Sequence, residues 1–429
     1  MTLRVRLLWC LLVALVGVGC APPATPDVLL LVVGTLRADR LGSYGHHPPG
    51  RGVVALAEDG VVFENAVAPS SQTEPALASL FTSLLPSAHG VTTADASLPP
   101  EPPTLAEAFA AAGWETVAVS ASSAFADPSR GLSRGFERVA TLPQTPQEQS
   151  RAQAGSAVLV RDRTITKRAI EVLAEERTRP LFLMVHWMAP HPGYDARGRF
   201  KRMGQRNFSG PVDGSLDQLM QLSRGEMQLD AVDLAHLRAL YEAEVWSADA
   251  QVQGLVEHLG RIDALDRAVV AVVSDHGESL GEGGRFGHGT TLHREVLHVP
   301  LVVRRPGGGD DGARVATAVG VVDVGPTLLA LAGLDDVRVT AGRSLVPLLG
   351  GAAPDDPQRP IVSELHPDPA IAAAWGAQRH RAAVTTDRFS LLVGSDGSAA
   401  LYEASDPKQE RDLAAERPET VARLSAALD

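Results

Sequence analysis

Residues 268–277 of the chain are "AVVAVVSDHG", six apolar residues followed at once by serine, aspartate, histidine and glycine. An apolar run of this length predicts a strand that is buried on both faces, as in the middle of a parallel sheet. Asp275 and His276 would then lie at the carboxyl end of the strand, where both can reach one divalent cation, and Gly277 permits a sharp turn. The stretch predicts a metal site or, as the plainer alternative, a strand-to-loop turn with polar surface residues.

On either side of this stretch, strand-length apolar runs alternate with helical patterns. Val28–Val33 and Leu181–Trp187 predict two further buried strands, and helical spacing covers Thr164–Glu176 and Leu229–Leu259. Between Lys201 and Ser223 no period is visible, so we expect a surface loop there. The alternation predicts an α/β fold with a mostly parallel sheet and helices on both faces, and such sheets bind ligands at their carboxyl edge.

The pattern changes after Pro354. Three short strand patterns separated by turn residues follow, and the chain closes with a helical pattern near Pro418–Leu428. The strand patterns are Arg381–Thr385, Arg388–Val393 and Ala399–Tyr402. They predict a small antiparallel sheet. We therefore expect a large α/β domain over residues 27–353 and a small C-terminal domain over residues 354–429.

Composition limits the class of protein. The chain has 429 residues, of which 45% are hydrophobic and 21% charged, as in ordinary globular proteins. Its length favours one large domain with a smaller appendage. The formal net charge is -12, which argues against a protein that grips the phosphate backbone of a nucleic acid.

The N-terminus has the features of a targeting segment. Two arginines precede the apolar run Leu7–Val18, which is short for a bilayer span, and Cys20 follows, ahead of a proline-rich stretch. This resembles a bacterial lipoprotein signal, although the usual leucine three residues before the cysteine is a glycine. We expect residues 1–26 to be signal peptide and tether, Cys20 to carry lipid, and the protein to be exported and anchored in the bacterial cell envelope. Plain secretion and a buried helix are the alternatives.

A second candidate for chemistry is the segment Ser71–Pro75, which leads into the helical pattern Ala76–Leu84. Thr73 can cap this helix, so its hydroxyl would lie among free backbone N–H groups at the positive end of the helix dipole. Such a position binds an oxyanion and suits a nucleophile that attacks sulfur or phosphorus. The alternative is a plain N-cap.

Two histidines complete the candidate site. His191 follows the buried strand that ends at Trp187, and His288 stands between two glycines after the Asp275 region. Histidines in such contexts can donate N–H groups to the charge on a transferring group. The alternative for each is an ordinary surface residue.

Taken together, five segments resemble the sulfatase family, in the family's order and through nearly all of the chain after the tether. They are "PDVLLLVVGTLRADRLGSYG" from Pro26, "SSQTEPALASLFTSLLPSAHGV" from Ser70, "FLMVHWMAPHPGY" from Phe182, "SDHGESLGEGGRFGHGTTLHREVLHVPLVV" from Ser274 and "LYEASDPKQERDLA" from Leu401. The resemblance implies an alkaline-phosphatase-like central sheet with helices on both faces, and a small C-terminal domain with an antiparallel sheet.

The resemblance also implies residue roles. Thr73 stands at the nucleophile position, which is a modified cysteine or serine in true sulfatases and a threonine in phosphoglycerol-transferring relatives, so formylglycine formation is excluded here. Asp275 and His276 match ligands of one divalent metal ion that Thr73 would share, and calcium, magnesium, manganese and zinc are the candidates. His191 and His288 match residues that hold the sulfate or phosphate. The implied partner is a small anionic ester, with phosphate and phosphonate esters favoured over sulfate.

Several departures from the family pattern affect this site. The acidic metal ligand at the end of the first strand is Gly34 here, and Asp39 lies five residues further on. A histidine of the family is replaced by Gly283, and an acid before Pro-His by Ala189. Losing an anionic ligand weakens metal binding.

Two hypotheses follow. One is a metal-dependent hydrolase or transferase of phosphate, phosphonate or sulfate esters with Thr73 as nucleophile. The other is a catalytically impaired pseudoenzyme, a lipoprotein that uses the pocket to bind an anion or a partner.

Overall fold

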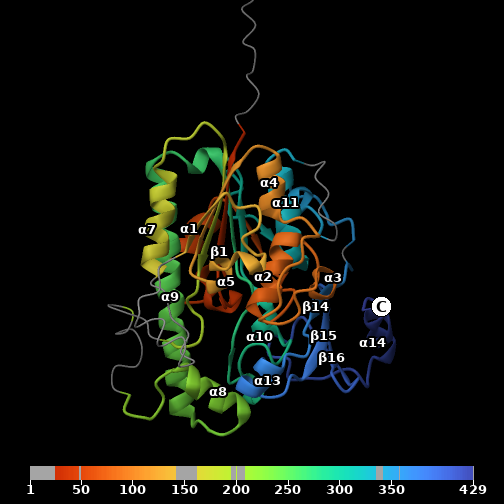
Figure 1. The fold of residues 1–429 in the computed structure, drawn as a ribbon. Coiled ribbons are helices and arrows are strands. Elements are labelled where there is room, and N and C mark those ends of the chain that lie inside the picture. Colours follow the sequence, from red (N-terminus) through yellow and green to blue (C-terminus); the bar gives the residue numbers. More distant parts are fainter. Residues whose placement is uncertain are drawn as a thin grey trace, which may run out of the picture.

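The computed structural model describes residues 25–47, 50–141, 162–194, 200, 208–334, 342–356 and 358–428. Its centre is an eight-stranded sheet in the order β12-β2-β11-β7-β1-β6-β4-β5 (Figure 1). The strands are β1 Asp27–Val33, β2 Val61–Phe63, β4 Glu115–Ser120, β5 Arg138–Thr141, β6 Leu181–Trp187, β7 Ala268–Val273, β11 Leu301–Arg304 and β12 Arg314–Val315. The run from β7 to β5 is parallel, and β11 is antiparallel to both neighbours. The predicted mostly parallel sheet is confirmed.

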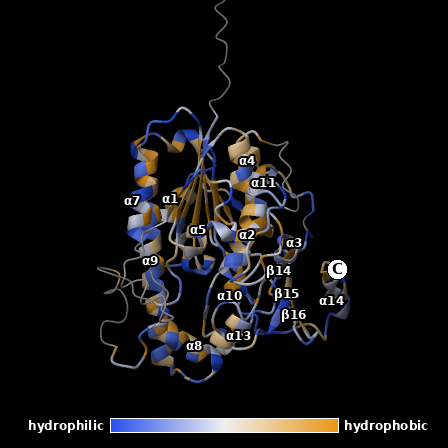
Figure 2. Ribbon diagram, in the orientation of Figure 1, coloured by the Kyte–Doolittle hydropathy of each residue, from blue (hydrophilic) through white to orange (hydrophobic). Residues whose placement is uncertain are grey.

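Helices cover both faces of this sheet, because side chains alternate between the faces along each strand. In β1, Leu29 and Leu31 pack in one core, with α1 Gly52–Ala57, α7 Asp162–Leu173 and α9 Ala231–Arg261. Val28 and Leu30 pack in the opposite core, with α2 Thr73–Thr82, α4 Leu105–Ala111 and α11 Val324–Leu331. Figure 2 shows the hydrophobic sheet between the two helical layers.

The C-terminal region forms a separate four-stranded antiparallel sheet, in chain order. Its strands are β14 Ile361–Glu364, β15 His380–Thr385, β16 Phe389–Gly394 and β17 Ala399–Glu403, and α14 Pro418–Ser425 packs beside them. The predicted sheet is confirmed, while the strand β14 was not predicted. The boundary between residues 353 and 354 stays a prediction.

Shorter elements complete the described chain. The helices are η1 Ala38–Arg40, η2 Gly42–Tyr44, α3 Pro86–His89, α5 Ser123–Ala126, η3 Pro128–Arg130, α8 Leu216–Arg224, η5 Leu265–Arg267, η6 Glu282–Gly284, α10 Arg294–Leu297, η7 Val321–Asp323, α12 Val346–Leu349 and α13 Pro369–Trp375. The short strands are β3 Ala66–Val67, β8 Ser279–Leu280, β9 Phe286–Gly287, β10 His298–Val299 and β13 Val319–Gly320.

The expected surface loop over residues 201–223 is partly wrong. Its second half contains the helix α8, which Ser215 caps through the backbone N–H of Gln218. Leu219 and Leu222, three residues apart, are buried, and this spacing is helical. Residues 201–207 lie outside the described chain.

The N-terminal targeting segment, including Cys20, also lies outside the described residues, which begin at 25. Among the helices of the described chain, none is long and apolar enough to cross a membrane.

Candidate active site

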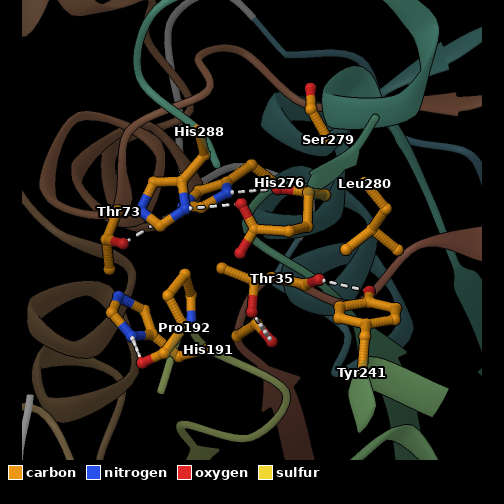
Figure 3. Close-up of polar contacts among 12 residues, drawn as sticks. Thr35, Thr73, His191, Pro192, Tyr241, His276, Ser279, Leu280 and His288 are labelled. Atoms are coloured by element: carbon orange, nitrogen blue, oxygen red, sulfur yellow. Dashed lines mark hydrogen bonds and ion pairs between the residues drawn. The ribbon is translucent and has the colours of Figure 1, made fainter. Parts of the chain in front are cut away.

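The predicted site residues come from elements that end or begin at the carboxyl edge of the sheet. Asp275 and His276 follow β7, His191 follows β6, and Thr73 opens α2. Figure 3 shows Thr73 and the rings of the three histidines gathered around one space. The structure therefore brings these residues, which are distant in the sequence, close together. The role of each residue stays a prediction.

The central contact joins Thr73 to His276. The hydroxyl oxygen of Thr73 lies 3.1 Å from Nε2 of His276, across 203 residues of sequence. Nδ1 of His276 lies 2.9 Å from the carbonyl oxygen of Gly277. Because a carbonyl only accepts, Nδ1 carries the proton, and the free lone pair of Nε2 accepts the hydroxyl proton of Thr73. Burial lowers the pKa of His276, which keeps the ring neutral.

Thr73 is not the N-cap that we expected. Gln72 occupies the N-cap position in an extended conformation and makes no side-chain capping hydrogen bond, and Thr73 is the first helical residue. Its hydroxyl is directed to His276 instead. The N–H groups of the first turn precede the first intrahelical bond, from Ala76 to Gln72, so the start of α2 still favours an anion.

Asp275 is fully buried, and its two carboxylate oxygens have different environments. Oδ1 accepts the backbone N–H groups of Thr35 at 2.9 Å and of His276 at 2.8 Å. Oδ2 lies 3.6 Å from Nε2 of His276 and has no hydrogen-bond partner within the described chain. Burial alone would raise the pKa of Asp275, but His276, His186 and the two backbone donors hold it below its usual value. An ionised carboxylate therefore faces the site.

His288 and His191 lie against this pair. The ring centroids of His288 and His276 are 4.7 Å apart, and those of His288 and His191 are 5.3 Å apart. Burial lowers the pKa of both His191 and His288 to about 4. Nδ1 of His288 lies 3.1 Å from the buried carboxyl group of Glu278, whose pKa is raised by burial to about 8. Both rings are neutral near pH 7 and can hydrogen-bond an oxyanion.

The residues present do not fit a complete resident metal site. Gly34 offers no side-chain oxygen, and Asp39 is bonded to Arg37 at 2.8 and 2.9 Å. In the described ranges, no group of three or more His, Cys, Asp or Glu side chains is arranged to hold a metal ion. Asp275, His276 and a neutral threonine hydroxyl supply too few charged donors for the six to eight ligands of calcium or the octahedron of magnesium. The predicted cation therefore has an incomplete ligand set.

The other two departures, Ala189 and Gly283, lie in different surroundings. The backbone N–H groups of Met188 and Ala189 both donate to the carboxylate of Asp162, at 3.3 Å, which anchors the turn ahead of His191. Gly283 lies outside the site, because it lines a different cavity together with Arg285. Its replacement therefore affects a different part of the molecule.

Sequence reasoning missed two residues that position the site. Glu278 contacts His288. The sequence could have indicated this residue, because it closes the "SDHGE" stretch that contains the predicted metal ligands. Tyr241 donates its hydroxyl to the carbonyl of Thr35 at 2.8 Å and accepts the N–H of Arg37. No local pattern marks Tyr241, because it lies in the middle of the long helix α9.

Comparisons with known proteins agree with this architecture. The sequence model of the sulfatase family matches residues 26–334. Arylsulfatase K of Homo sapiens is 28% identical over 202 residues, and that of Gallus gallus 30% over 206 residues; each match covers 46% of this chain and 37% of the relative. The chain thus matches little more than a third of the length of these curated relatives.

Solved structures share the fold. The phosphonate monoester hydrolase of Agrobacterium radiobacter has a TM-score of 0.72 at 23% identity, with 94% of each chain covered. BT1596, a 2-O GAG sulfatase, has a TM-score of 0.75 at 20% identity, with 94% of this chain and 91% of that chain covered. Members of the sulfatase family generally use a divalent metal ion. Because the family model covers most of its length, this chain belongs to the sulfatase family.

Proposed function

We propose that the protein is a hydrolase or transferase of phosphate, phosphonate or sulfate esters in which Thr73 is the nucleophile. The observation that carries the proposal is the contact between the hydroxyl of Thr73 and the free Nε2 of His276. A nucleophile hydrogen-bonded to a base, which is itself oriented by a third group, is the arrangement of covalent catalysis. The phosphonate monoester hydrolases and sulfatases of the same fold support the ester class.

The chemistry proceeds in two transfers. The Oγ1 atom of Thr73 attacks phosphorus or sulfur while its proton passes to Nε2 of His276. The bond to the ester oxygen, on the opposite side of the phosphorus or sulfur from Thr73, breaks, and the departing alkoxide takes a proton from water and leaves as an alcohol. His276 keeps the proton of Thr73 until the second transfer returns it to Oγ1. Water or a second alcohol then takes the group from Thr73 by the reverse route, which gives hydrolysis or transfer.

The neighbours of the dyad stabilise the charges that develop. The carboxylate of Asp275, 3.6 Å from Nε2, favours the imidazolium form of His276. The oxygens of the transferred group face the start of α2 and the neutral rings of His191 and His288. None of these steps is assigned to a metal ion, because the ligand set is incomplete.

The test is turnover of an aryl phosphate, an aryl phosphonate and an aryl sulfate by the wild type, Thr73→Ala and Thr82→Ala. We expect Thr73→Ala to lower kcat by roughly 10³-fold or more, because it removes the nucleophile. In the same helix, the hydroxyl of Thr82 donates to the carbonyl of Ala78 within α2 itself, so we expect its loss to leave kcat nearly unchanged. Equal effects of the two substitutions would contradict the role of Thr73.

The second candidate function is a non-catalytic protein that binds an anion. It is favoured by Gly34 and by the incomplete ligand set within the described chain. Calorimetric titration with the aryl phosphonate distinguishes the candidates. Binding without turnover by the wild type supports this second function, and measurable turnover excludes it.

We also propose that Cys20 carries a lipid that anchors the protein in the bacterial cell envelope. Cys10 is the only other cysteine and provides a matched control. In cells grown with labelled palmitate, the wild type and Cys10→Ala should carry the label, and Cys20→Ala should not. The Cys20→Ala protein should also be lost from the membrane fraction. A label retained in Cys20→Ala would contradict the anchor.

A further inference from the structure

A large cavity lies apart from the candidate active site. Its volume is about 800 Å³, and its walls come from η1, α9, residues 281–298 and residues 407–410 of the C-terminal region. In Figure 1, α10, which contributes to this wall, is seen between α9 and β16. The lining includes none of the candidate active-site residues. It is therefore a second place at which a ligand could bind.

The lining is cationic, although the protein as a whole has a formal net charge of -12. Six cationic side chains line the cavity, against four carboxylates. The cations are Arg37, Arg40, Arg238, Arg285, Arg294 and Lys408. A hollow with one dominant sign of charge concentrates ligands of the opposite sign.

Ion pairs within the lining already use three of the carboxylates. Arg37 binds Asp39 at 2.8 Å and Glu282 at 2.8 Å. Arg285 binds Glu295 at 2.7 Å. Arg37 is thus opposed by two carboxylates and Arg285 by one. The excess of positive charge therefore resides on the remaining cations.

Arg238, Arg294 and Lys408 are the cations of the lining without a carboxylate partner among the residues that the structure describes. Nε of Arg238 donates to the carbonyl of Leu280 at 3.0 Å, and Nη1 of Arg294 lies 3.3 Å from Oδ1 of Asn65. Burial lowers the pKa of Arg294, and the opposing attraction of Asp39 does not offset this effect. Nε of Arg40 is also buried, with no hydrogen-bond partner in the described ranges. This atom lies 3.6 Å from Oδ1 of Asp39. The guanidinium groups that face the cavity without a carboxylate are thus those of Arg238 and Arg294.

Gly283 lines this cavity beside Arg285. Its backbone has a φ of +53°, and an added side chain would meet the guanidinium of Arg285. Arg285 therefore occupies the space next to Gly283 and turns toward Glu295. The departure from the family pattern at this position therefore lies at the cavity and not among the Thr73 site residues.

We propose that this cavity binds a small organic molecule that carries two or more phosphate or sulfate groups. Guanidinium groups bind such tetrahedral oxyanions through paired N–H donors. Arg238 on α9 and Arg294 on α10 approach from different elements, which suits a ligand with more than one anionic group. A volume of about 800 Å³ lies in the range of small-molecule sites. This binding is separate from the ester chemistry at Thr73.

The test is calorimetric titration of the full chain with fructose 1,6-bisphosphate and with a disulfated disaccharide. Fructose, inorganic phosphate and inorganic sulfate are the comparison ligands. The variants are Arg238→Gln/Arg294→Gln, the single change Arg238→Glu, and the control Arg163→Gln/Arg423→Gln, in which two exposed arginines lose the same charge. Arg238→Glu keeps Arg294 in place, so it reports on the cavity even if the double variant folds poorly.

We expect one of the two organic anions to bind more tightly than fructose and the inorganic ions. Binding should weaken about tenfold or more in both Arg238 variants and stay unchanged in the control. Thr73→Ala should bind normally, even though it loses turnover, so the two proposals can fail separately. No binding, equal weakening in the control, or loss confined to Thr73→Ala would each overturn the proposal.

Discussion

Gly34 decides how the site can bind a cation. It lies at the end of β1, where its N–H donates to the carbonyl of Trp187 at 2.9 Å. An added Cβ would be 3.3 Å from the carbonyls of Trp187 and Met188 and 3.7 Å from Nε2 of His186. His186 Nε2 and Asp275 Oδ2 are both buried and lack hydrogen-bond partners in the described chain. A carboxylate at this position would thus lie beside unused polar atoms.

We predict that Gly34→Asp creates a divalent-metal site. Without metal the variant should be less stable than the wild type, because the new carboxylate is crowded by two carbonyl oxygens. With a bound ion it should gain about 2.7 kcal/mol at a metal concentration of 100 times Kd. Thermal unfolding with and without calcium, magnesium, manganese and zinc measures this gain.

The control is Gly254→Asp, in α9, where an added Cβ meets only Thr166 at 3.9 Å. It adds the same charge away from the site and should not respond to metal. A metal response of the wild type equal to that of Gly34→Asp would contradict the incomplete ligand set.

At the scale of elements, His89 links α2 to α3. Its Nε2 lies 2.9 Å from the hydroxyl of Ser79, and its Nδ1 accepts the N–H of Val91 at 3.1 Å. The ring is buried and must be neutral to accept at Nδ1. Burial lowers the pKa of His89 to about 4.

This histidine should make α2 sensitive to acid. The unfolded chain binds the proton more readily than the folded one between pH 6.5 and about 4, so stability falls as the pH falls through that window. His89 contributes at most about 1.4 kcal/mol per pH unit to the slope of the free energy of unfolding against pH. We expect His89→Asn to flatten the slope, while the exposed His47→Asn leaves it unchanged. Urea unfolding from pH 4 to 7 measures the free energy of unfolding of the wild type and the two variants. Parallel plots of this free energy against pH for all three proteins would contradict the role of His89.

For the whole molecule, the two predicted domains share a core. Ile361, Leu365 and Ala383 of the C-terminal region belong to the hydrophobic cluster on one face of the central sheet. The hydroxyl of Ser363 donates to the carbonyl of Ala68, and the N–H of Glu364 donates to the carbonyl of Pro69. The small sheet therefore packs into the core of the large domain and is hydrogen-bonded to the segment that follows β3.

We accordingly predict that both parts unfold in a single transition. Scanning calorimetry should give a calorimetric enthalpy equal to the van't Hoff enthalpy. A chain ending at Ala353 should aggregate, because it exposes apolar surface that the C-terminal region covers. Two separate calorimetric transitions would show that the parts are independent.

The sequence by itself determined the fold class and the strands that deliver the site. β1, β6 and β7 are predicted correctly because a strand covered on both faces needs apolar residues throughout, which is a local and visible pattern. The candidate residues Asp275, His276, Thr73, His191 and His288 could be named because they follow such strands or open a helix. Their meeting at one edge follows from the parallel order of the strands.

Only the tertiary structure decided which side chains touch. It directed Thr73 to His276 rather than to its own helix, paired Asp39 with Arg37, and placed Gly283 at a separate cavity. Tyr241 reaches Thr35 across 206 residues of sequence. The physical reason is that a side chain's partner depends on how distant elements pack, and no local period in the sequence carries that information.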